Sequence, residues 1–202
     1  MEIILSTGNR SKIEQIKAAL EDLGIPILSL AEAGVVGEVE EDGSTLEENA
    51  FKKAQFVHSQ TGKWSMADDT GIFIDALDGE PGIHSARWAG PNATTEQIRD
   101  FALQKLSGVP LEKRTATFKT VVVIISPNGE MDSFSGKVRG CLLETPRTPC
   151  QPNMPYSGIF VPDGQEKGKE KVWAEMSVEE ENAISHRGEA FRKVKNFFER
   201  LM

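Results

Sequence analysis

The chain has 202 residues, of which 23 are basic and 31 are acidic, so its formal net charge is −8. This balance disfavours binding to a nucleic-acid backbone, which requires a clustered basic surface. No apolar stretch approaches the ~20 residues of a membrane-spanning helix, and no basic segment precedes the short apolar N-terminus, so no signal peptide is expected. The two cysteines lack CxxC spacing. We therefore expect a cytoplasmic protein with neither nucleic-acid nor membrane partners.

The N-terminal region begins with a strand pattern followed by a helix pattern. Apolar residues over 2–6 predict a short buried strand, and the spacing of apolar residues over 11–23 predicts an amphipathic helix that ends at Gly24. Residues 31–43 are acidic and contain several glycines, which is typical of a loop or a frayed strand.

A second helix and two short strands are expected next. Ser44 and Glu47 have the spacing of a capping box, which predicts a helix over 45–60. Strands are predicted near 64–67 and 72–75, with Asp-Asp-Thr-Gly as the turn between them.

The second half of the chain is richer in long strands. The predicted elements are, in order, a Gly/Pro-rich loop at 78–92, a helix from Thr94 to about 107, two strands joined at Pro127-Asn128-Gly129, a proline-dense loop at 146–155, the strand Gly-Ile-Phe-Val-Pro, a short helix capped by Ser177, and a helix over 188–201. No internal repeat or linker interrupts the chain. The pattern predicts one α/β domain over 1–202 with a mixed sheet.

The segment Ser-Thr-Gly-Asn-Arg-Ser-Lys at 6–12 is a candidate anion site. A strand, a glycine turn and a helix N-terminus direct backbone N–H groups toward an anion, and Lys12 adds a positive charge. The complete G-x-x-x-x-G-K-[ST] pattern is absent. An ordinary turn in which Asn9 or Ser11 caps the helix is the alternative.

Asp68 and Asp69 are adjacent carboxylates between apolar residues, and burying either one is costly without a compensating cation or donor. One explanation is a turn in which they accept backbone N–H groups. The other is a Mg²⁺ site, because Mg²⁺ prefers oxygen ligands and retains waters for a phosphate-bearing substrate. Further carboxylates for such a site, or for an ordinary solvated surface, are Glu38, Glu40, Glu41 and Asp42.

Two further pairs have alternative explanations. Asn49 and Lys53 are four residues apart on the second helix, and they either face a phosphate or lie at the surface. His186 and Arg187 precede the last helix and offer donors to a purine edge or a phosphate. Ser185 before them is a candidate helix cap.

The ordered motifs of this chain resemble those of the inosine/xanthosine triphosphate pyrophosphatase (Ham1-like) family. These motifs are S-T-G-N-x-x-K, E-N-A-x-x-K-A, A-D-D-T-G, P-G-I-H-S-A-R, A-E-M and A-I-S-H-R. The resemblance implies an elongated mixed sheet flanked by helices, two lobes around a central cleft, and a homodimer. It also implies Mg²⁺-dependent hydrolysis of the non-canonical purine nucleoside triphosphates ITP, dITP and XTP to the monophosphate and pyrophosphate, which would cleanse the nucleotide pool.

The resemblance implies a role for individual residues of this chain. Asp69 and Asp68 would be the catalytic carboxylates, and the metal would be held by Asp69 with Glu40 or Glu41. The substrate-binding residues implied are Thr7, Gly8, Asn9, Arg10, Ser11, Lys12, Asn49, Lys53, Thr70, Arg87, Tyr156, Ser157, His186 and Arg187. Of these, residues 7–12 and Lys53 would hold the triphosphate, and His186 with Arg187 would lie at the base.

The base-binding half departs from the family pattern. Where the family has Phe-Gly-Tyr/Trp-Asp, this chain has Met154 for the Phe, Tyr156 as a match and Ser157 for the Asp, and Glu181 replaces a lysine. Glu181 either takes part in base recognition or points to solvent. The same chemistry with a relaxed base preference, and a nucleotide-binding module without turnover, are therefore alternative functions.

Overall fold

The computed structural model describes residues 1–37 and 39–202, so Glu38 lies outside the described residues, as does the side chain of Ser11. The chain divides into two compact units. Unit 1 comprises residues 1–69, 120–136 and 187–202, and unit 2 comprises residues 70–119 and 137–186. The single domain over 1–202 and the cleft stay predictions. No helix in the described ranges is long and apolar enough to cross a membrane.

The described strands form a mixed seven-stranded sheet, which confirms the predicted fold class. Its order is β2 (Ile27–Leu28), β1 (Ile3–Leu5), β3 (Trp64–Ile74), β5 (Thr115–Ile125), β6 (Met131–Leu142) and β7 (Phe160–Pro162), with β4 (Pro81–Gly82) paired to β3. β1 is parallel to β2 and β3, whereas β4 is antiparallel to β3 and β7 is antiparallel to β6. The long strands β3, β5 and β6 each contribute residues to both units.

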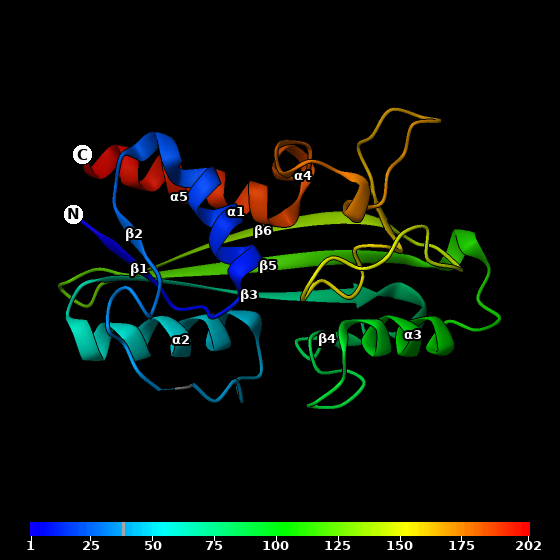
Figure 1. The fold of residues 1–202 in the computed structure, drawn as a ribbon, viewed down its shortest axis with the longest axis horizontal. Coiled ribbons are helices and arrows are strands. Elements are labelled where there is room, and N and C mark those ends of the chain that lie inside the picture. The colour runs from blue at the N-terminus through cyan, green and yellow to red at the C-terminus, as the bar shows by residue number, and fades with distance from the viewer. Residues whose placement is uncertain (38) are drawn as a thin grey trace. The chain divides into compact units, whose positions relative to one another are not determined.

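Unit 1 has helices on both faces of its part of the sheet. Figure 1 shows α1 (Arg10–Leu20) and α5 (His186–Leu201) on one face and α2 (Leu46–Thr61) on the other. A short 3-10 helix, Glu21–Leu23, follows α1 and ends at Gly24 with a positive φ of 63°. Glycine adopts this left-handed conformation without strain. The predicted end of this helix is thus confirmed.

Side chains of unit 1 alternate between two hydrophobic cores, as successive residues of a strand must. Met66, Val122 and Ile124 pack with residues of α1 and α5, including Phe191, Val194 and Phe198. Ala67, Val123 and Ile125 pack instead with Ala50 and Ala54 of α2. Asp68 and Asp69 continue this alternation along β3. Asp68 therefore faces α1 and α5, and Asp69 faces α2.

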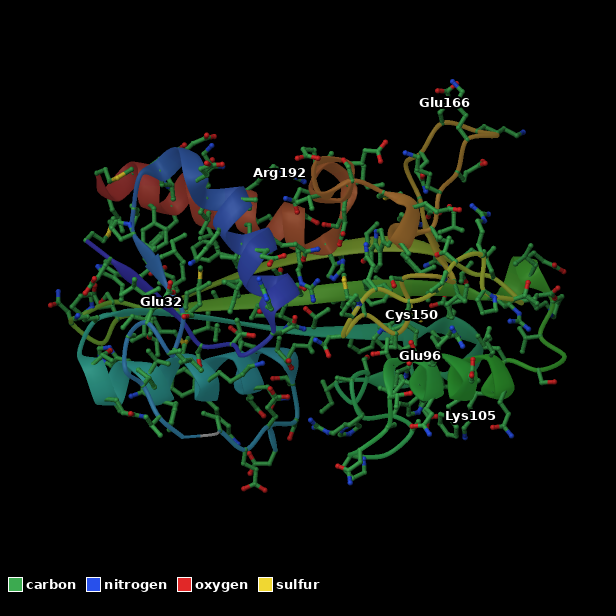
Figure 2. The ribbon with its side chains drawn as sticks, viewed as in Figure 1. Glu32, Glu96, Lys105, Cys150, Glu166 and Arg192 are labelled. Carbon is green, nitrogen blue, oxygen red and sulfur yellow. The ribbon has the colours of Figure 1, made fainter. Side chains whose placement is uncertain are left out.

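Unit 2 encloses a separate core. Its helices are α3 (Thr95–Lys105) and α4 (Val178–Ile184), and both begin with the predicted capping boxes, at Thr94 with Gln97 and at Ser177 with Glu180. Its 3-10 helices are Asp75–Leu77, Leu111–Lys113 and Trp173–Glu175. The proline-dense loop approaches α3, and Figure 2 shows Cys150 of this loop next to the helix. Arg99 Nη1 of α3 lies 3.8 Å from the free thiol of Cys150.

Three details of the predicted elements were wrong. Asp-Asp-Thr-Gly is no turn but part of the continuous strand β3. Its Gly71 passes so close to the backbone of Gly82 in β4 that a side chain would collide there. The cap of α2 is Thr45, whose hydroxyl accepts from Glu48 N, one residue later than predicted. Strand β2 was not predicted, because two residues carry no detectable period.

A buried arginine joins the segments around the C-terminal end of α3. Arg114 is 5 % exposed and donates from Nε to Val109 O at 2.9 Å, from Nη2 to Leu106 O at 2.8 Å and from Nη1 to Leu143 O at 3.3 Å. The carbonyl groups near a helix C-terminus lack intrahelical donors and favour a positive charge. Arg114 therefore supplies a charged donor to three carbonyl oxygens, of which Leu106 O also accepts from Val109 N at 3.0 Å.

Replacing Arg114 with methionine should lower the free energy of unfolding by about 2–4 kcal/mol, because three carbonyl oxygens lose a charged donor. Urea denaturation measures this change. The matched control is Arg139→Met, since Arg139 is exposed in its ion pair with Asp75 and should cost less than about 1 kcal/mol. Equal losses in the two variants would contradict this role of Arg114.

Candidate active site

The segment before α1 forms a capped helix start. Asn9 Oδ1 accepts from Lys12 N at 3.3 Å, and Asn9 N donates to Thr7 Oγ1 at 3.2 Å. The alternative that Asn9 caps this helix is thus confirmed, and it is compatible with an anion site because Lys12 remains in the first turn. Arg10 differs from its neighbours, since its exposed side chain pairs with Glu14 at 3.2 Å.

Four residues of unit 1, which we call the Asp68 group, meet on the α1 and α5 face. They are Lys12, Gln15, Asp68 and Arg187. Lys12 Nζ lies 2.8 Å from Asp68 Oδ2, and Arg187 Nε lies 3.8 Å from the same oxygen. Arg187 Nη1 also donates to Gln15 Oε1 at 3.1 Å. Two cations thus share one carboxylate oxygen of a side chain that is 1 % exposed.

Electrostatics keep Asp68 ionised. Burial alone would raise the pKa of this carboxyl, but Lys12, Arg187 and Lys53 outweigh burial and hold the pKa well below its usual range. Burial lowers the pKa of Lys12, and the positive charges of Arg187 and Lys53 lower it further against the opposing effect of Asp68. Asp68 therefore acts in this structure as the counter-ion of two buried cations.

A second set, the Asp69 group, lies on the α2 face of unit 1 and comprises Glu41, Asn49, Lys53 and Asp69. Lys53 Nζ lies 3.1 Å from both Asp69 Oδ1 and Glu41 Oε1. Asn49 Nδ2 donates to Asp69 Oδ2 at 3.3 Å, and Asn49 Oδ1 accepts from Gly43 N at 2.8 Å. Because Asn49 is fully buried, it holds the loop and the carboxylate together.

Asp69 and Lys53, at the centre of the Asp69 group, both have raised pKa values. Burial raises the pKa of Asp69, with Lys53 and Lys12 opposing this effect and Glu41 adding to it. Burial would lower the pKa of Lys53, yet the carboxylates of Asp69, Asp68 and Glu41 raise it overall. A carboxylate with a raised pKa in a polar cluster is suited to accept a proton.

The residues of the Asp69 group fit a divalent cation. Glu41 and Asp69 both contact the Lys53 ammonium, which shows that this position already accommodates one positive charge between two carboxylates. Mg²⁺ is typically bound through one or two carboxylates, waters and substrate phosphates. No cluster of three acidic, histidine or cysteine side chains suited to a metal occurs among the described residues. Glu40 is exposed in the same loop.

The loop that carries Glu41 is held against α2. Asp42 forms an ion pair with Lys52 of this helix. A Cβ on Gly43 would lie 2.6 Å from Asn49 Oδ1 and 2.9 Å from Glu48 Cβ, so only glycine fits this approach. The local sequence therefore places Glu41 next to Lys53 and Asp69.

Tyr156 and Ser157 belong to unit 2, and both are buried there. Tyr156 Oη donates to Ser85 O at 3.1 Å in the 78–92 loop. Ser157 Oγ accepts from Gln151 N at 2.8 Å and donates to Met154 O at 2.8 Å. The Ser157 hydroxyl is thus bonded within its own loop. Direct substrate contacts by these two residues stay predictions.

His186 lies in an aromatic cluster of unit 2. Its ring centroid is 5.1 Å from those of Phe118 and Trp173, at interplanar angles of 26° and 35°. His186 is 1 % exposed and Glu181 is 3 % exposed. The alternative that Glu181 points to solvent is therefore wrong. Glu181 lies in the short helix α4, whose C-terminal cap is Ser185.

The structure groups the predicted residues only in part. Within unit 1 it brings Lys12 and Arg187 to Asp68, and Lys53, Asn49 and Glu41 to Asp69. Thr70 and Arg87 belong to unit 2, and their contacts with substrate stay predictions, as do those of Gly8 and Ser11. Sequence analysis did not identify Gln15, which bonds to Arg187, or Trp173, which packs against His186. Gln15 follows Lys12 by one helical turn, which is the only signal it gives.

Comparison with protein families gives a match over nearly the whole chain. The family model described as the Ham1 family matches residues 3–197. A protein of Thermoanaerobacter pseudethanolicus named dITP/XTP pyrophosphatase is 41 % identical over 197 residues, covering 98 % of this chain and 96 % of that protein. One of the same name from Bacillus subtilis is 38 % identical and covers 98 % and 97 %.

Solved structures agree with this match. The Ham1 protein of Coxiella burnetii has a TM-score of 0.84 at 32 % identity and covers 99 % of both chains. The Ham1 protein of Staphylococcus aureus has a TM-score of 0.83 at 32 % identity and covers 100 % of both chains.

The low pKa of Asp68 predicts a specific dependence of stability on pH. A carboxyl whose pKa is lower in the folded state than in the unfolded state stabilises the protein above its unfolded pKa, and this contribution is lost as pH falls toward the folded value. Between pH 5 and pH 3, the free energy of unfolding of the metal-free native chain should fall by about 1 kcal/mol more than that of Asp68→Asn.

Urea denaturation at several pH values tests this expectation. Asp132→Asn serves as the control, because Asp132 is an exposed carboxylate in unit 1. If Asp68→Asn shows the same slope against pH as the native chain, Asp68 does not carry the proposed ionic contribution.

Proposed function

This chain belongs to the Ham1 family, and we propose on that basis that it hydrolyses nucleoside triphosphates to the monophosphate and pyrophosphate, with dITP, ITP and XTP as substrates. The observation that carries the proposal is the Asp69 group. Its buried carboxylate lies between an amide donor and an ammonium group, each within 3.3 Å. This arrangement combines a proton acceptor with a cation-binding position, both of which hydrolysis of a phosphoanhydride requires.

The proposed reaction assigns separate tasks to the two groups of unit 1. The oxygen of a water molecule attacks the α-phosphorus, and the bond from that phosphorus to the bridging oxygen of pyrophosphate breaks. Asp69 accepts the proton of the attacking water. Lys12 and Lys53 bind phosphate oxygens, and Lys53 also orients Asp69. Mg²⁺ held by Asp69 with Glu41 or Glu40 would neutralise charge on the phosphate oxygens.

A relaxed base preference is a second candidate function, and the bonding of Ser157 favours it. Ser157 is 1 % exposed, and its hydroxyl proton is donated to Met154 O, so this side chain has no donor left for a carbonyl on a base edge. Sites that leave a buried polar group unpaired with the wrong substrate can discriminate by a factor of ~10⁴ or more. Loss of such a group should reduce the preference for 6-oxo purines over adenine.

A homodimer, a cytoplasmic location and the absence of nucleic-acid and membrane partners complete the proposal. They rest on the sequence resemblance and on the acidic composition of the chain.

Asp69→Asn should lose pyrophosphate release by ~10³-fold or more while the fold survives, because the amide keeps the shape but neither accepts the proton nor binds a cation strongly. The measurement is pyrophosphate release from dITP, ITP, XTP, GTP and ATP, with and without Mg²⁺. Asp132→Asn, on the exposed part of β6, is the matched control and should retain native rates.

The same five triphosphates distinguish the proposed hydrolysis from a relaxed base preference and from a binding module without turnover. Release from no triphosphate would contradict the proposed hydrolysis and favour a binding module. Release from all five at similar kcat/KM would favour the relaxed preference over the strict one. Near-native rates in a folded Asp69→Asn variant would remove Asp69 from the reaction.

A further inference from the structure

Trp173 carries a buried hydrogen-bond donor that the proposed reaction does not use. The side chain begins a 3-10 helix of unit 2 and is 2 % exposed. Its Nε1 has no hydrogen-bond partner among the described residues. Buried polar groups in native proteins are nearly always paired, because an unpaired donor has lost its bonds to water without replacement. This N–H therefore requires an acceptor that the described part of the chain does not supply.

The neighbours of Trp173 make a structural water a poor explanation. Its ring packs against Phe118, Phe160 and His186 at centroid distances of 4.5, 4.6 and 5.1 Å. A buried water typically makes about three hydrogen bonds, and the two phenylalanine rings supply none. These rings also pack against each other at 4.8 Å. The packing therefore fixes the orientation of the indole rather than solvating its N–H.

A second buried polar atom without a partner lies on an adjacent segment. Gln151 Oε1 is buried and has no hydrogen-bond partner within the described ranges. Ser157 joins the two segments, since its Oγ accepts from Gln151 N at 2.8 Å and its O accepts from Ala174 N at 2.9 Å. The hydroxyl proton of Ser157 is itself donated to Met154 O. An indole donor and an amide oxygen thus remain for a ligand on the two segments that Ser157 joins.

Trp173 differs from its polar neighbours in one chemical respect. An indole N–H only donates, whereas the amide of Gln151 presents a donor or an acceptor according to its orientation, and the ring nitrogens of His186 do so according to tautomer. A donor that cannot become an acceptor pairs with a carbonyl oxygen and leaves an amino group unpaired. Position 6 of a 6-oxo purine carries such an oxygen, whereas adenine carries an amino group there.

We propose that Trp173 is a specificity-determining residue whose indole N–H donates to the exocyclic oxygen of a 6-oxo purine. The inference rests on the proposed function for the class of substrate. It adds a donor that no motif of the sequence indicated, and this donor takes the place of the one that Ser157 does not offer. It therefore favours a strict preference for 6-oxo purines over the relaxed one.

The test compares ITP with purine riboside 5′-triphosphate, which carries hydrogen in place of the oxygen at position 6. Trp173→Phe keeps an aromatic ring but removes the N–H. With Mg²⁺ present, kcat/KM for ITP should fall about tenfold or more in this variant, whereas kcat/KM for purine riboside triphosphate should stay within about threefold of native. A loss of packing alone would lower both values alike, so the ratio of the two effects isolates the hydrogen bond.

Trp64→Phe is the matched control. It makes the same chemical change in unit 1, where Trp64 packs against Phe197 and Phe198, and both substrates should keep their native kcat/KM. Thermal unfolding of the two variants separates a loss of stability from a loss of base recognition.

A binding measurement on the native chain depends neither on turnover nor on a folded Trp173 variant. The chain has three tryptophans, whose indole N–H resonances in the ¹⁵N-labelled protein are assigned with Trp64→Phe and Trp88→Phe. IMP should move the Trp173 resonance downfield, as a newly formed hydrogen bond does. Purine riboside monophosphate should not move it downfield.

Three outcomes would overturn the inference. These are equal losses for the two substrates in Trp173→Phe, native kcat/KM for ITP in that folded variant, and a Trp173 resonance that IMP leaves in place. Failure of the proposed function looks different. In that case IMP would shift the Trp173 resonance, yet no nucleoside triphosphate would be hydrolysed.

Discussion

The alternation of side chains along β3 is the constraint on which the rest of unit 1 depends. Two adjacent carboxylates would repel each other strongly if both faced one site. A strand instead directs them to opposite faces, where Asp68 meets Lys12 and Arg187 and Asp69 meets Lys53 and Asn49. Each buried carboxylate therefore has its own cationic partners. The helices α1, α2 and α5 are positioned to supply them (Figure 1).

This arrangement makes the charges of unit 1 interdependent. Removing one partner of a buried ion pair leaves the other charge without compensation, which is strongly destabilising, whereas intact buried pairs contribute little net stability. We therefore propose anion binding, rather than stability of the fold, as the role of the Asp68 group. A hydrophobic cluster at the same position would serve packing alone, as Met66 and Phe191 do next to it.

The sequence predicted elements whose signals are local. The capping boxes at Thr94 and Ser177 and the glycine end at Gly24 were identified because a few neighbouring residues decide these features. The turn at Asp68-Asp69 was predicted wrongly because local propensity takes no account of cations from α1, α2 and α5. Those cations lie far away in sequence, and they allow a strand to carry two carboxylates through its buried centre.

In the candidate site, too, residues that belong to local motifs were predicted, whereas residues that depend on distant partners were not. Lys12, Lys53, Asp69 and Arg187 were identified from motifs, and the structure places each of them in one of the two groups of unit 1. Gln15 was missed, because a glutamine on a helix is chemically unremarkable until the arginine that it faces is known. Glu181 was assigned to solvent as one alternative, yet it is buried, because the polarity of a side chain does not show which face of a helix the fold covers.

The residues proposed for phosphate chemistry and those implied for the base differ in how freely they can change. The Asp68 and Asp69 groups consist of charges that compensate one another, so a single substitution there alters several partners at once. Ser157 instead forms hydrogen bonds within its own loop, and Tyr156 bonds to a neighbouring loop of unit 2. Substitutions at these positions leave the charges of unit 1 unaltered. Departures from the family pattern at Met154, Ser157 and Glu181 are therefore compatible with an intact set of the residues that we propose for hydrolysis.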